Sequence, residues 1–381
     1  WKNRAVAWDN SLLEELRLRE KQNLSKTIRR QLKDLNNFQE RAAEGLNQKD
    51  LSKASVKSLN DMYHAAFQAQ WTLLEKIGVT NSEENFEEDD VIIQVPDEPV
   101  SEDIDLKTEI RRLCEEKDAI ILAHYYTIGD IQEIADFVGD SLALARKAAE
   151  TDAKVMVMCG VHFMAETCKL LSPEKTVLCP DLNAGCSLAD SCKAEDLKKY
   201  KEEHPGYQVI SYVNTTAAVK ALTDIVVTSG NAKKVVDQLP KEARLIFGPD
   251  YNLGNYINEV TGRNMLLWNG GCHVHERFSV NKIIELKNQY PDAIVMAHLE
   301  CKGPVLALAD VKGSTATMLN YAQQSEKKQF IVATEAGILY EMQRTCPDKE
   351  FIPVPPEISE SGLECSCNEC QYMKMNTLLK I

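Results

Sequence analysis

The N-terminal part of the chain carries apolar residues at helical spacing. They recur every three or four residues, which is the period of an amphipathic helix, in two runs. The first run contains Leu24, Ile28, Leu32 and Leu35, and the second contains Val56, Leu59, Met62, Tyr63, Phe67, Trp71 and Leu74. Gly45 and Gly78 follow these runs and are typical helix stops. Residues 1–79 are therefore predicted to form an all-α segment, and nothing in them indicates chemistry.

The pattern changes after this segment. Residues 80–105 are acidic and contain Pro96 and Pro99, a composition that is typical of a linker. From about residue 106 onward, short apolar runs alternate with stretches of helical periodicity. This alternation predicts an α/β region that is built on parallel sheets.

The α/β region repeats itself. Asp118–His124 and Asp292–His298 have closely similar sequences, and Gln208–Tyr212 lies between them. These three runs end, 88 and 86 residues apart, at His124, Tyr212 and His298. An aspartate follows each run end by twelve residues, a hydroxyl follows by seventeen, and a cysteine comes farther along. The aspartates are Asp136, Asp224 and Asp310, the hydroxyls are Ser141, Ser229 and Thr315, and the cysteines are Cys186, Cys272 and Cys370.

Three copies of this size predict three similar β-α-β-α-β domains around a pseudo-threefold axis, preceded by the all-α segment. The expected domain boundaries are residues 106–195, 196–280 and 281–381. Ligands of α/β units bind beyond the carboxyl ends of the strands, so three converging units would share one central active site. The alternative is that ordinary α/β regularity aligns these residues by chance.

Composition narrows the classes of function. The net charge of −14 argues against nonspecific binding of nucleic acid. The sequence has no apolar run long enough to predict a membrane span. Its twelve cysteines are scattered along a long chain, which favours thiols in a reducing compartment over a disulfide framework. We therefore expect a cytoplasmic protein that acts on small molecules.

The repeated hydroxyls are candidates for binding anions. Ser141, Ser229 and Thr315 each lie in a turn of small residues that opens a predicted helix. Helix N-termini offer free backbone N–H groups and a partial positive charge, and a hydroxyl adds one more donor. Three such turns facing one cavity would hold two or three carboxylate or phosphate groups. The alternative is that these residues are only helix N-caps, worth about 1 kcal/mol each.

Polar pairs mark the ends of the predicted strands. Each pair has spacing i, i+2, which directs both side chains to one face of an extended strand. The pairs are His124 with Tyr126, Tyr212 with Asn214, and His298 with Glu300. Such a ring of side chains could bind a polar substrate and move protons. A single buried histidine is more often structural, but matched pairs in three repeats favour a functional role.

The repeated cysteines are candidates for metal ligands. Cys186, Cys272 and Cys370 each follow a predicted strand and would converge on the axis. Thiolates favour iron–sulfur clusters and zinc. Three ligands on a four-iron cluster would leave one iron open as a Lewis acid. Zinc is the competitor, because Cys365 and Cys367 give Cys370 a zinc-like local spacing. His275 could reach the same region as an acid, a base or a substrate ligand.

Residues from about 106 to 381 resemble the quinolinate synthase family (NadA type). The resemblance rests on several ordered motifs, and the N-terminal segment is not part of it. The motifs are Ala123–Tyr126, Ile134–Ser141, Phe163–Thr167, Tyr212–Asn214, Val227–Asn231, Pro249–Gly254, Cys272–His275, Gly313–Thr315, Thr334–Gly337 and Cys370–Asn376. No single motif decides the matter, but together they are specific.

The resemblance implies an enzyme that condenses iminoaspartate with dihydroxyacetone phosphate to quinolinate in de novo NAD biosynthesis, with loss of phosphate and water. It also implies a [4Fe–4S] cluster, and functional coupling to an L-aspartate oxidase is expected. The implied cluster ligands are Cys186, Cys272 and Cys370, with Cys370 preferred to Cys365 and Cys367. The implied substrate-binding residues are His124, Ser141, Tyr212, Asn214, Ser229 and Thr315. Tyr126 and Glu300 are expected to transfer protons, assisted by His275 and His298.

Three other interpretations remain open at this stage. A different iron–sulfur hydro-lyase would share the pocket but act on one hydroxy acid, so substrate tests separate the two. An iron–sulfur carrier or redox sensor would hold its cluster on four cysteines and would not need polar strand ends. If the N-terminal helices carried the function, deletion of residues 1–105 would abolish it.

Overall fold

A computed structural model describes residues 104–357 and 368–381. The predicted all-α segment of residues 1–79 lies outside the described residues. Most of the predicted linker of residues 80–105 lies outside them too, as do Cys365 and Cys367. Within the described ranges, no helix combines the length and the hydrophobicity needed to cross a bilayer.

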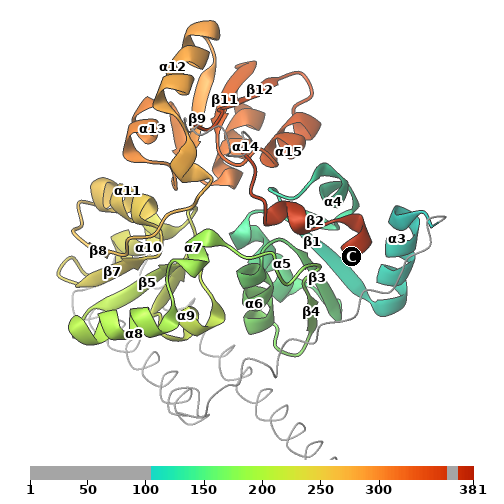
Figure 1. The fold of residues 1–381 in the computed structure, drawn as a ribbon, viewed down its shortest axis with the longest axis horizontal. Coiled ribbons are helices and arrows are strands. Elements are labelled where there is room, and N and C mark those ends of the chain that lie inside the picture. The colour runs from blue at the N-terminus through green and yellow to red at the C-terminus, as the bar shows by residue number, and fades with distance from the viewer. Residues whose placement is uncertain (1–103, 358–367) are drawn as a thin grey trace, which may run out of the picture. The chain divides into compact units, whose positions relative to one another are not determined.

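The described residues contain three parallel sheets, each of four strands (Figure 1). The first sheet comprises β1 (Ala119–His124), β2 (Phe137–Gly139), β3 (Val155–Cys159) and β4 (Thr176–Leu178). The second comprises β5 (Gln208–Tyr212), β6 (Ile225–Val227), β7 (Leu245–Gly248) and β8 (Leu266–Leu267). The third comprises β9 (Ile294–His298), β10 (Val311–Gly313), β11 (Gln329–Ala333) and β12 (Glu350–Pro353).

Helices connect these strands and cover the sheets. Those of the first repeat are α3 (Leu106–Lys117), α4 (Gly129–Ile134), α5 (Ser141–Glu150), α6 (His162–Leu171) and α7 (Ser187–Asp190), and α8 (Ala194–Glu203) leads into the second repeat. Next come α9 (Ala217–Ala221), α10 (Ala232–Gln238), α11 (Tyr251–Thr261) and the 3₁₀ helix η2 (His275–Arg277). The third repeat has α12 (Val280–Gln289), α13 (Gly303–Leu308), α14 (Thr315–Gln324) and α15 (Ile338–Thr345). Two 3₁₀ helices, η3 (Met373–Met375) and η4 (Leu378–Lys380), follow near the C-terminal end.

The three sheets have the same strand order. In each, the first strand of the repeat lies between the second and the third, and the fourth pairs with the third. The register matches as well, because His124 pairs with Gly139, Tyr212 with Val227 and His298 with Gly313. In all three sheets the repeated hydroxyl lies two residues beyond that partner. The predicted α/β fold of three similar repeats is confirmed; the domain boundaries at residues 195 and 280 stay predictions.

The repeated aspartates explain part of this regularity. Oδ2 of Asp136 accepts a hydrogen bond from the backbone N–H of Ile121, at 2.7 Å. The backbone N–H of Asp136 donates in turn to the carbonyl oxygen of Ile121. Asp224 makes the same two bonds with Val209, and Asp310 makes them with Val295. Each aspartate therefore ties the start of the second strand to the first and fixes the register of its repeat.

Buried apolar side chains join the first two repeats into one core. Met158 and Phe163 of the first repeat belong to the same buried cluster as Tyr212 and Phe247 of the second. Most of the apolar core of the third repeat forms two separate clusters around β9 and β11. The central strands are buried along most of their length, as the apolar runs in the sequence predict.

The C-terminal segment, residues 368–381, returns to the first repeat (Figure 1). Met373 joins the core shared by the first two repeats, and Nδ2 of Asn376 donates to the carbonyl oxygen of Gly160 at 2.8 Å. Leu378 and Ile381 pack against the cluster that contains Ile110 of α3. Residues 368–381, which follow the strands of the third repeat, therefore pack on the first repeat.

Candidate active site

One cavity receives side chains from all three repeats. Every site residue that the sequence analysis named lines this cavity. From the first repeat come His124, Tyr126, Ser141 and Cys186; from the second come Tyr212, Asn214, Ser229, Cys272 and His275; from the third come His298, Glu300, Thr315 and Cys370. The structure therefore brings these residues together, whereas their individual roles stay predictions.

The strand ends differ from expectation in one respect. The prediction that both members of each polar pair lie on the strand is wrong, because β1, β5 and β9 end at the first member. In two repeats a histidine then holds the turn that follows. Nδ1 of His124 accepts from the backbone N–H of Tyr126 at 3.1 Å, and Nδ1 of His298 accepts from that of Glu300 at 3.3 Å.

Burial sets the charge of the two histidines, and these hydrogen bonds set the tautomer. Burial is the main cause that lowers the pKa of His124 to about 3 and that of His298 to about 4. Both imidazoles are thus neutral at pH 7, and their Nδ1 atoms are used as acceptors. A neutral imidazole that accepts at Nδ1 carries its proton on Nε2. Nε2 of His298 lies 3.4 Å from the hydroxyl of Ser229, so this nitrogen is directed toward the second repeat.

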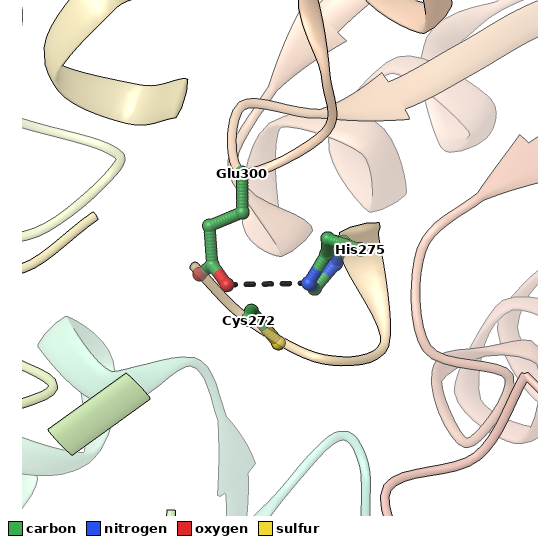
Figure 2. Close-up of side chains that lie close together, drawn as sticks. All are labelled: Cys272, His275 and Glu300. Atoms are coloured by element: carbon green, nitrogen blue, oxygen red, sulfur yellow. Dashed lines mark ion pairs between the residues drawn. The ribbon is translucent and has the colours of Figure 1, made fainter. Parts of the chain in front are cut away.

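Glu300 lies at the centre of a buried polar network. The hydroxyl of Tyr212 donates to its Oε1 at 2.6 Å, and Nδ1 of His275 lies 3.2 Å from its Oε2 (Figure 2). Nδ1 of His298 is 3.6 Å from Oε1. Burial acts to raise the pKa of Glu300, but the two imidazoles and the tyrosine hydroxyl outweigh it and lower the pKa below its ordinary value. Glu300 is therefore ionised at neutral pH.

A threonine that the sequence analysis did not assign to the site connects two of its residues. Oγ1 of Thr334 lies 2.7 Å from the hydroxyl of Tyr126 and 3.0 Å from Nε2 of His275. Hydrogen bonds and close polar contacts therefore run from Tyr126 through Thr334, His275 and Glu300 to Tyr212. The sequence feature that could have identified Thr334 as a site residue was the motif Thr334–Gly337, in which Thr334 directly follows the apolar run of β11.

The three repeated hydroxyls lie where helices begin. Ser141 is the first residue of α5, whose N-cap Asp140 accepts from the N–H of Ala143. Thr315 is the first residue of α14, which Ser314 caps in the same way. Ser229 lies in the turn before α10. In α5 and α14 the neighbouring residue is the cap, so the hydroxyls of Ser141 and Thr315 remain available to a ligand in the cavity. The hydroxyl of Ser229 is not used as a cap either, and it lies 3.4 Å from Nε2 of His298.

Asn214 presents an unused polar atom in this cavity. Its Oδ1 is buried and has no hydrogen-bond partner among the described residues. The loop that carries it is held by Lys220, whose Nζ donates to the carbonyl oxygens of Val213 and Thr215. Buried polar atoms without partners are uncommon, so a bound ligand is the natural partner for this amide.

The three cysteines have the properties of ligands to a metal cluster. Burial raises the pKa of Cys186 to about 12, and it also raises the pKa values of Cys272 and Cys370. The charges of Glu300, Cys186 and Cys370 raise the pKa of Cys272 further, so the three thiols lie close enough to repel one another as thiolates. Bound cations remove this repulsion, which is how thiolates are stabilised in metal sites.

Geometry favours a cluster over a single ion on these thiols. Among the described residues, the three sulfur atoms do not form a set within 4.8 Å of one another. A single tetrahedral ion would draw its ligands closer together than a cluster with several metal ions does. The donor set therefore suits an iron–sulfur cluster.

A buried ion pair positions one of these thiols. Oε1 of Glu335 accepts from the backbone N–H of Cys370 and lies 2.9 Å from Nζ of Lys374. Oε2 of the same carboxylate accepts from the N–H of Gly337. Nζ of Lys374 also donates to the carbonyl oxygen of Tyr126. These bonds tie the Cys370 loop both to the third repeat and to the first.

Comparisons with known proteins agree on one family. The family model "NadA: Quinolinate synthetase A protein" matches residues 108–381. The quinolinate synthase of Nostoc punctiforme is 55% identical over 278 residues, which are 73% of this chain and 84% of that protein. That of Synechocystis sp. is 53% identical over 73% of this chain and 86% of its own length. That of Chloroherpeton thalassium is 52% identical over 76% and 88%.

Proposed function

Because the chain belongs to the quinolinate synthase family, we propose that it makes quinolinate for NAD biosynthesis by condensing iminoaspartate with dihydroxyacetone phosphate. Phosphate and water are released. The observation that supports this proposal is one cavity in which three cysteines, three hydroxyls at or near helix N-termini and a buried network of polar contacts meet. The substrates, the cluster type and the residue roles below are part of the proposal.

The cavity offers groups for each charge of the two substrates. Iminoaspartate has two carboxylates, and the triose has one phosphate. The turns of Ser141, Ser229 and Thr315 would bind these anions through backbone N–H groups and hydroxyls. His124 and His298 are neutral, so their Nε2–H groups would add hydrogen bonds to the anions without adding charge. The unused Oδ1 of Asn214 would accept from a substrate N–H or O–H group.

A [4Fe–4S] cluster is proposed on Cys186, Cys272 and Cys370. The family implies an iron–sulfur cluster in general, and three thiols on four irons leave one iron without a protein ligand. When bound, such a cluster supplies a Lewis acid to a substrate oxygen. Glu335 and Lys374 would position the Cys370 thiol for this purpose.

Loss of water requires that a C–H proton is removed and that a leaving hydroxyl receives one. Glu300 is ionised, so it can accept a proton, and its lowered pKa means that it does so as a weak base. Burial raises the pKa of Tyr126 well above its ordinary value, so its hydroxyl stays protonated and can donate. His275 and Thr334 lie between these two groups, so the proton could pass from Glu300 back to Tyr126 within the protein.

The proposal is tested by measuring quinolinate formation. The protein is prepared without oxygen, its iron and sulfide content is determined, and dihydroxyacetone phosphate is added with iminoaspartate. Iminoaspartate is an imine and hydrolyses in water, so we propose that an L-aspartate oxidase supplies it. Oxidase present during the assay should therefore give more quinolinate than iminoaspartate that is prepared first and added later. A cluster-replete sample that forms no quinolinate would instead indicate a different iron–sulfur hydro-lyase.

Replacing Thr334 by valine is expected to lower kcat by about 10- to 100-fold, because reacting groups lose rate steeply when they are misplaced. Valine has nearly the same shape but removes the hydroxyl, which leaves Tyr126 and His275 without this partner. Steady-state kinetics of cluster-replete protein is the measurement.

Two further variants separate positioning from a loss of structure. Thr334→Ser should restore most of the rate, because serine keeps the hydroxyl. Thr345→Val removes a hydroxyl that bonds only within α15 and its C-terminal end, and it should leave kcat unchanged. A Thr334→Val enzyme with normal kcat would show that the link through this hydroxyl plays no part in turnover.

A further inference from the structure

Three side chains in the cavity form a compact set of possible metal donors that differs from the three cysteines. The donor atoms of Cys272, His275 and Glu300 all lie within 4.8 Å of one another. Cys272 lies in the loop before η2, His275 is the first residue of η2, and Glu300 follows β9. Figure 2 shows the carboxylate of Glu300 and the imidazole of His275 facing each other, with Cys272 beside them.

His275 and Glu300 are each held through one side-chain atom, which leaves the other atom of each directed at its neighbour. Nε2 of His275 is bonded to Oγ1 of Thr334, and Oε1 of Glu300 accepts from Tyr212. The remaining atoms, Nδ1 of His275 and Oε2 of Glu300, face each other at 3.2 Å. Metal-binding histidines and carboxylates are usually held in this way, with one atom on the metal and the other on a neighbouring oxygen or donor.

Nδ1 of His275 lacks a hydrogen-bond partner. The side chain of His275 is 2% exposed, and no described residue makes a hydrogen bond to its Nδ1. The short distance to Glu300 is therefore a close contact whose geometry does not satisfy the nitrogen. A buried nitrogen of this kind is the atom that a metal ion would use.

We propose that the protein without its cluster binds one divalent cation of the zinc type through Cys272, His275 and Glu300. One thiolate, one imidazole and one carboxylate are all zinc ligands, and a fourth position would open toward the cavity. Cys272 is also a proposed cluster ligand, so zinc and cluster exclude each other. On the proposed function, the zinc form is inactive, because its ion occupies both Glu300 and His275.

The test uses cluster-free protein and Zn²⁺ in competition with a coloured chelator. One ion per chain is expected to bind tightly. Glu300→Gln, His275→Asn and Cys272→Ala should each weaken binding by at least about 10- to 100-fold, since loss of a supporting contact alone has that effect. Cys186→Ala and Cys370→Ala are the matched controls, and both should bind Zn²⁺ as the unchanged protein does. Protein with a full cluster should take up no zinc at this site.

Cobalt provides a second readout that reports the ligands directly. Co²⁺ bound in place of zinc should show an absorption band from a single thiolate, and Cys272→Ala should remove it. If Cys186→Ala or Cys370→Ala abolishes binding, the ion sits on the three cysteines and the proposal is overturned. Binding that survives Glu300→Gln and His275→Asn overturns it as well. Far-ultraviolet circular dichroism of each metal-free variant shows that it is folded before it is counted.

Discussion

Glu300→Gln is expected to lower kcat by about 10²- to 10⁴-fold, the usual contribution of a general base, while the iron content stays unchanged. The glutamine Oε1 can still accept the hydrogen bond from Tyr212, so the shape of the network is largely kept. The amide cannot take up a proton, and it carries no charge beside His275 and His298. The measurement is steady-state quinolinate formation by anaerobic protein, with iron and sulfide determined in the same sample.

Glu341→Gln is the matched control for this variant. Glu341 is a largely buried carboxylate of the third repeat that pairs with Arg344 and does not line the cavity. Its replacement should leave kcat unchanged. A Glu300→Gln enzyme that holds its cluster and turns over normally would remove Glu300 from the proton-transfer step.

Cys272→Ala is expected to abolish both cluster binding and quinolinate formation. Alanine removes one of three proposed thiolate ligands, and the two that remain cannot hold a four-iron cluster firmly. Cys186→Ala and Cys370→Ala should have the same effect, since each repeat contributes one ligand. Iron and sulfide analysis and the visible absorption of anaerobically reconstituted protein measure the cluster, and quinolinate formation measures activity.

Cys192→Ala and Cys346→Ala control for the general effect of removing a buried thiol. Both side chains are about as buried as core residues, at 3% and 4% exposure, and neither lines the cavity. These variants should keep cluster and activity. A full cluster in Cys370→Ala would move the third ligand to Cys365 or Cys367.

Local sequence patterns were enough to predict the repeats and the gathering of the site. The apolar runs that end at His124, Tyr212 and His298 are the ends of β1, β5 and β9. Parallel strands in matching repeats present their carboxyl ends at matching positions, so residues at equal offsets reach a common cavity. The repeated aspartates were visible in the sequence as well, but their bonds to Ile121, Val209 and Val295 required the structure.

Contacts between distant parts of the chain could not be predicted in this way. Tyr126 meets Thr334 across 208 positions, and no local period connects them. The same holds for Lys374 and the carbonyl oxygen of Tyr126, which are 248 positions apart. The assumption of extended backbone at Tyr126 and Glu300 failed for a related reason, because histidine Nδ1 atoms hold these residues in turns.

The C-terminal segment, residues 368–381, links the proposed binding of metal at Cys370 to the docking of this segment on the first repeat. Cys370 precedes, in one short stretch, the residues Met373, Asn376 and Leu378 that dock on the first repeat. A ligand that binds the docked form must stabilise docking by the same free energy by which docking favours the ligand. On the proposed ligation, iron bound at Cys370 would stabilise the docked form of this segment, and a protease that needs the segment undocked would degrade the iron-depleted enzyme first. The lifetime of the protein would then follow the iron supply of the cell.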